Sequence, residues 1–222
     1  MPPGTLLLAG LDLSRIRSSP LAGKLPLVAP FAEAFHEASR LLIAYDGKDI
    51  LIIASGPFQA APAAGTLVQP GLALCGPAAA VGAAIERHRQ GARAPSRLLD
   101  FAAASGQPIW IVAQGGATLP LTGNAANLNR LLRDSEFAGI TASLGPSIQI
   151  EATAAARTPE AAGEVEGTLR AILGLMAMAE KRGSDTAALL GAVQIRRQDR
   201  TVHAAVAATP EALGKLLDSL SQ

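Results

Sequence analysis

Runs of apolar residues, separated by turns rich in glycine and proline, occur in the same order in both halves of the chain. In the first half these runs predict strands over residues 5–12, 40–46, 49–56, 66–69 and 72–76. In the second half they predict strands over residues 108–114, 138–144, 147–155, 192–197 and 200–207. Asp46-Gly47 and Pro70-Gly71 each separate two such runs, as in the turn of a β-hairpin.

Apolar residues at helical spacing predict the intervening helices. The first half has them over about 27–39 and 77–90, and the second half over about 124–134, 159–181 and 210–220. Thr158-Pro159-Glu160 and Thr209-Pro210-Glu211 begin two of these helices with a capping hydroxyl, a proline at the first helical position and a carboxylate near the positive end of the helix dipole. A short helix over 97–104 would lie in the connection between the halves.

The order of elements predicts an internal duplication. Both halves follow β-α-β-β-α-β-β-α, with the middle helix of the first half reduced to residues 57–65. We therefore expect an α+β fold of two fused, pseudo-symmetric repeats, 1–105 and 106–222, with antiparallel sheets and helices packed on one face. The two repeats would be separate domains or one compact two-repeat domain. Coincidence among alanine-rich segments is the alternative, because low complexity inflates such matches.

The strands of the two halves differ in their polarity. First-half strands such as LLIAY and ILIIAS are apolar on both faces, which is typical of strands covered on both sides. Second-half strands alternate, so one face of that sheet should meet water. The first half's own helices, the second half or a second copy of the chain, in a homodimer, would have to cover the first-half apolar residues. These residues are Leu6, Leu8, Ile43, Ile50 and Ile52.

Composition argues against several classes of function. Among 222 residues, charged residues make up 17% and aromatic residues 3%, with a net charge of +1, so neither a basic field nor stacking residues favour nucleic acid. The longest apolar stretch, residues 71–85, is shorter than the ~20 residues of a membrane-spanning helix. Cys75 is the single cysteine and should be a buried thiol.

The chain contains none of the common catalytic or phosphate-binding motifs, and its three histidines are scattered, so we expect no cofactor or metal and no enzymatic activity. The expected function is a non-catalytic binding or scaffolding module with a protein partner. The best candidates for contact are polar residues of the second sheet: Gln149, Glu151, Arg196 and His203. The alternative is a hydrolase or isomerase in which Glu151 and His203 form a general-base pair. An ordinary wetted sheet face also explains these residues.

Three segments carry a resemblance to a known group: TLLLAGLDLSRIRSSPLAGKL, DILIIASGPF and LALCGPAAAVGAAIERH. They resemble a large group of uncharacterised bacterial proteins in Asp12 with residues 15–21, in residues 56–58 and in residues 76–85. Members of that group are usually exported, so the resemblance implies a periplasmic or secreted domain and supplies no catalytic residues. The start of the chain lacks the basic and apolar regions of a signal peptide. We expect an extracytoplasmic location if a signal has been trimmed, and a cytoplasmic one otherwise.

Overall fold

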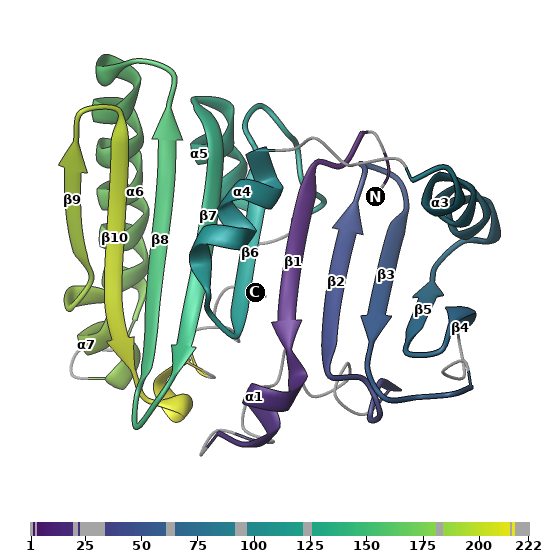
Figure 1. Ribbon diagram of the computed structural model, residues 1–222. Helices are drawn as coiled ribbons and strands as arrows, with labels where there is room; N and C mark the ends of the chain where they lie inside the picture. Colours follow the sequence, from purple (N-terminus) through teal and green to yellow (C-terminus); the bar gives the residue numbers. More distant parts are fainter. Residues whose placement is uncertain are drawn as a thin grey trace. The chain divides into compact units, whose positions relative to one another are not determined.

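A computed structural model describes residues 2, 4–19, 22, 34–60, 65–91, 97–121, 126–180, 184–213 and 215. The chain divides into two compact units, Met1–Val112 and Ala113–Gln222. Its fold is mixed α+β with antiparallel strand pairing, as the sequence predicts (Figure 1).

The described residues of the first unit form five complete strands in the lateral order β1-β2-β3-β5-β4, and each pair of neighbours is antiparallel. Strand β6 begins in this unit and ends in the second. The elements of the first unit are β1 (Leu7–Asp12), α1 (Leu13–Arg17), β2 (Arg40–Tyr45), β3 (Ile50–Ser55), β4 (Gly65–Gln69), β5 (Leu72–Cys75), α3 (Ala78–Arg89) and α4 (Arg97–Ser105).

The second unit has the lateral order β6-β7-β8-β10-β9, so its strands follow the same first-second-third-fifth-fourth order as those of the first unit. Along the chain, helices α6 and α7 connect its third strand, β8, to its fourth, β9. Its elements are β6 (Ile109–Gln114), α5 (Leu128–Arg133), β7 (Ser135–Leu144), β8 (Ile148–Ala156), α6 (Pro159–Ala179), α7 (Asp185–Gly191), β9 (Gln194–Gln198) and β10 (Thr201–Ala208).

The predicted hairpin at Asp46-Gly47 is present. Gly47 has φ +100°, which a residue with a Cβ rarely adopts, and the Asp46 carboxylate accepts hydrogen bonds from the amides of Lys48 and Asp49 at 3.0 and 2.8 Å. These bonds, that from Asp49 first, lower the pKa of Asp46. The turn thus depends on a glycine at its first central position and on an aspartate immediately before it.

Burial in the first unit follows the prediction of strands covered on both sides only in part. Residues 8–11 of β1 are all buried, and Leu51 of β3 packs with Leu74 and with Val81 of α3. The expectation that Ile50 is hidden is wrong, because this first residue of β3 beside the hairpin is 51% exposed. Cys75 is buried as expected, and burial raises the pKa of its thiol.

Helix α6 covers one face of the second sheet. Its first turn is capped by Thr158, whose hydroxyl accepts a hydrogen bond from the Ala161 amide at 3.2 Å. Ala162 and Val165 on its inner side pack against Val202 of β10. Along β10, buried and exposed residues alternate from Val202 to Ala205, as predicted for a strand with one face toward water.

The helix predictions have mixed outcomes. Helices α3, α4, α5 and α6 match predicted helices, whereas α1 and α7 were not predicted. The helix predicted over 27–39 lies mostly outside the described residues. The C-terminal helix begins at Pro210 as predicted, with the Thr209 hydroxyl accepting from the Ala212 amide at 3.2 Å, and its predicted end lies outside the described residues. None of the described helices is both long and apolar enough to cross a membrane.

Candidate functional site

The predicted polar residues lie on one face of strands β8, β10 and β9, which we call the polar face. His203 stands at the centre, directly opposite Thr153 of β8 on one side and Arg196 of β9 on the other. Glu151 is two residues from Thr153 and lies opposite Ala205. All four candidates, Gln149, Glu151, Arg196 and His203, are exposed.

Three of the four candidates share a shallow hollow of about 390 Å³. Glu151, Arg196 and His203 line it, and the small side chain of Ala205 leaves room between them. Gln149 is further along β8, where its amide donates to the Ser147 hydroxyl at 2.8 Å. The structure therefore brings Glu151, Arg196 and His203 together and leaves Gln149 outside the hollow.

Among the described residues, the contacts of the polar face do not pair Glu151 with His203. Nδ1 of His203 and the Thr153 hydroxyl are 3.2 Å apart. Among the described residues, no hydrogen bond or ion pair joins Glu151 to His203, and their strand positions are diagonal, a relation that places side chains roughly 7–8 Å apart. A general-base pair needs a hydrogen bond between its two members, and the described contacts show none between Glu151 and His203.

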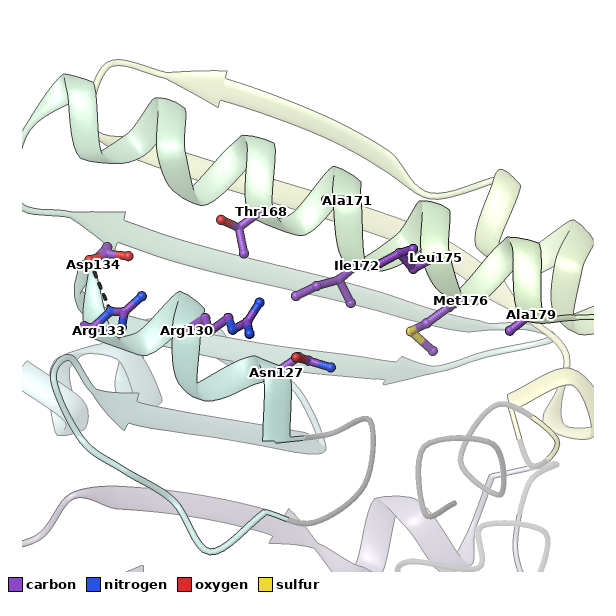
Figure 2. A pocket seen from close by; sticks show the side chains of 10 residues that line it. All are labelled: Asn127, Arg130, Arg133, Asp134, Thr168, Ala171, Ile172, Leu175, Met176 and Ala179. Carbon is purple, nitrogen blue, oxygen red and sulfur yellow. Dashed lines mark ion pairs between the residues drawn. The ribbon is translucent and has the colours of Figure 1, made fainter.

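A second concave surface lies between α5 and α6, and we call it the α5–α6 groove. It measures about 580 Å³. Figure 2 shows Ile172 and Met176 projecting from α6 toward α5, on which Asn127 and Arg130 lie. One wall is thus apolar and the other is basic and polar. The groove is lined by Asn127, Arg130, Arg133, Asp134, Thr168, Ala171, Ile172, Leu175, Met176 and Ala179.

The outward side of α6 continues the apolar wall into solvent. Leu175 is 67% exposed and Met178 is 84% exposed. From residue 171 to residue 179 the helix contains no polar side chain at all. A surface helix normally carries polar residues on its outer side, so this bare apolar end of α6 is unusual.

The charged residues near the groove differ in how well they are neutralised. Arg133 makes a long ion pair of 3.9 Å with Asp134 (Figure 2). Arg130 is exposed and, within the described part of the chain, has no hydrogen-bond or ion-pair partner. The basic wall therefore offers one free guanidinium and one weakly paired guanidinium.

Glu166 fixes the other half of α6 to the sheet. Its carboxylate accepts from Arg170 at 2.8 Å and from Arg197 of β9 at 3.2 Å. These two arginines, Arg170 first, lower the pKa of Glu166. The first half of α6 is thus held by ion pairs and by its packed inner side, whereas Leu175 and Met178 in the last turns are exposed.

The α5–α6 groove is not among the sites predicted from the sequence. The sequence did contain a signal, because the segment AILGLMAMA over residues 171–179 is apolar at every position around the helix. The predicted core-facing stripe accounts for the apolar residues on only one side of such a helix. The position of α5 beside it depends on tertiary packing, which periodicity alone does not reveal.

Comparison with protein families, with curated proteins and with solved structures finds no match to this chain. Among the described side chains, no three histidine, cysteine, aspartate or glutamate residues lie together as metal ligands would.

Proposed function

We propose that this protein is a non-catalytic binding module that contacts a partner protein through its second unit. The observation that carries the proposal is the exposure of Leu175 and Met178 beside the α5–α6 groove. Large apolar side chains that are grouped next to a concave surface are typical of protein interaction sites. Methionine adapts its shape to different contacts, which suits such a site.

The occupant we propose is a short amphipathic helix that carries carboxylates on one flank. Its apolar side would lie against Ile172, Leu175 and Met176, and its carboxylates would meet the free guanidinium of Arg130. The lining of α6 extends from Thr168 to Ala179, which corresponds to roughly 17 Å or three helical turns. This length matches the helix-in-groove mode of peptide recognition.

The polar face remains a second predicted contact surface. It includes Gln149, Glu151, Arg196 and His203, and it is on the side of the sheet opposite the residues that pack against α6. A partner bound in the groove would leave this face free. We keep the hydrolase or isomerase alternative as the weaker one, because Glu151 and His203 are not in hydrogen-bond contact.

We also infer that the two units descend from one duplicated element. The support is the shared lateral strand order, first-second-third-fifth-fourth, together with a helix or turn after the first strand of each unit. The resemblance to exported bacterial proteins supports an extracytoplasmic location. Fractionation of the native host would test this location, and recovery only with cytoplasmic markers would contradict it.

Two designed peptides test the groove. Each is a helix of ~14 residues with leucine on one side, flanked in one peptide by glutamate and in the other by lysine. We expect the fluorescence anisotropy of the glutamate peptide to rise on titration with the protein. The lysine peptide should bind at least about tenfold more weakly.

Leu175→Asp is the variant that tests the groove. Ile50→Asp, at an exposed apolar position in the first unit, is the matched control. We expect Leu175→Asp to weaken binding of the glutamate peptide about tenfold and Ile50→Asp to leave it unchanged. No binding, equal binding of both peptides, or equal loss in both variants would overturn the groove as the contact site. A homodimer across the same surface would show itself as a concentration-dependent mass that Leu175→Asp abolishes, and this result would also overturn the peptide proposal.

A further inference from the structure

The first unit contains a hollow of about 490 Å³ on one face of its sheet, and we call it the first-unit hollow. The strands β1, β2 and β3 form its floor, and Ala102 and Ser105 of α4 stand in its wall. Its size lies within the range of small-molecule sites, roughly 300–1,000 Å³.

Strand register divides the floor into two rows. Asp12, Arg40 and Ser55 are consecutive partners across β1, β2 and β3 and form a polar row at the strand ends. Gly10, Leu42 and Ile53 are the next row on the same face and are apolar. All six residues line the hollow. A ligand in it would meet charge at one end and hydrocarbon at the other.

Trp110 supplies an aromatic wall beside the apolar row. Its indole ring lies over Gly10, so closely that a Cβ at that position would overlap the ring. This contact explains a glycine in the interior of β1. Within the described residues, the indole N–H has no hydrogen-bond partner and remains available to a ligand.

The polar end of the hollow is rich in donors. Arg40 is 75% exposed, and among the described residues its guanidinium makes only a long ion pair of 3.6 Å with Asp12. Arg15 is held more firmly, because its guanidinium donates to the Gly106 carbonyl at 2.8 Å. The Ser55 hydroxyl has no partner among the described residues. The two guanidinium groups of Arg15 and Arg40 outnumber the single carboxylate of Asp12, so this end of the hollow carries a net positive charge.

We propose that the first-unit hollow binds a small carboxylate with an apolar body. The carboxylate accepts hydrogen bonds from Arg40 and Ser55, whose backbones are directly opposite each other. The apolar body lies on Leu42 and Ile53 beside the Trp110 ring. Asp12 contributes to selection, because it repels a second negative charge placed beside the first.

Fluorescence of the protein itself tests this proposal, since Trp110 is the only tryptophan in the chain. The probes are 4-phenylbutanoate and its uncharged amide, 4-phenylbutanamide. We expect the carboxylate to change the Trp110 emission in a saturable way and to bind at least about fivefold more tightly than the amide. Arg40→Gln should reduce this preference to about twofold or less, and Ser55→Ala should weaken the carboxylate alone.

Arg89→Gln, at an exposed position of α3 outside the hollow, is the matched control and should leave the titration unchanged. Far-ultraviolet circular dichroism of each variant shows whether it is folded. If Arg40→Gln does not fold, Ser55→Ala still tests the proposal. The absence of a saturable change, equal binding of acid and amide, or a preference that survives both Arg40→Gln and Ser55→Ala would overturn the proposal.

Discussion

The two units share a lateral strand order and differ in what connects the third strand to the fourth. In the second unit the connection contains α6, a helix of 21 residues, and α7. In the first unit it is the short segment between β3 and β4, whose described residues 56–60 form bends rather than a helix. A long connecting helix completes a core on its inner side and presents a new surface on its outer side.

This difference also separates the two proposed sites. The second unit presents a groove about three helical turns long beside exposed Leu175 and Met178, which suits a partner helix. The first unit keeps a concave sheet surface with Trp110 and Arg40 at its edge, which suits a small molecule. We propose that one strand arrangement supports two kinds of recognition, depending on the segment inserted between its strands.

The largest expected effect concerns the two sides of α6. Val165 is 2% exposed in the core, so Val165→Asp should lower the free energy of unfolding by roughly 3–5 kcal/mol, because it removes packing and buries an unpaired charge. Leu175→Asp on the exposed side should change it by about 0.5 kcal/mol or less. Urea denaturation of both variants measures the difference. Similar losses would mean that the end of α6 near Leu175 is covered.

The next effect concerns the close contact between Gly10 and Trp110 in the first unit. Gly10→Val should lower the free energy of unfolding by roughly 1–3 kcal/mol, because its side chain would overlap the indole ring. Gly174→Ala on the exposed side of α6 is the control, and it should be neutral or stabilising by up to about 1 kcal/mol since nothing lies near its added Cβ. A fully tolerated Gly10→Val would show that the Trp110 ring does not lie over β1.

The smallest effect depends on pH. The arginines beside Glu166 lower its pKa in the folded protein, so this carboxylate stabilises the fold above its unfolded-state pKa and loses that effect as pH falls through its folded-state pKa. Glu166→Gln should slightly lower the Tm at pH 7, and the difference from the wild type should vanish in acid. Glu164→Gln, an exposed control on the same helix, should not change the Tm. A difference for Glu166→Gln that persists below pH 3 would contradict this assignment.

Much of the fold could be predicted because its strands carry clear local signals. The Asp46-Gly47 turn, the alternation along β10 and the Thr158-Pro159 helix start each follow from a few adjacent residues. Helix α7 was missed because its seven residues are too few to establish a helical period. No local sequence signal predicts that the fifth strand of each unit, and not the fourth, lies beside the third. This order depends on where the segment after the third strand rejoins the sheet.

The candidate sites were harder to predict than the strands. The sequence identified Glu151, Arg196 and His203, which do meet on one face, because alternation along a strand fixes the side on which a residue lies. It did not identify Arg130, Arg40 or Trp110 as site residues. Their neighbours come from elements distant in the sequence, so only the packed structure brings them together.

A reciprocal charge exchange tests the central claim most directly. The double variant Arg130→Glu, Arg133→Glu reverses the basic wall of the α5–α6 groove and leaves the apolar wall of α6 intact. Anisotropy titrations with the glutamate and lysine peptides compare it with the wild type. We predict that the wild type prefers the glutamate peptide and that the double variant prefers the lysine peptide, each by about fivefold or more. An unchanged preference in the double variant would contradict the groove as the site of binding.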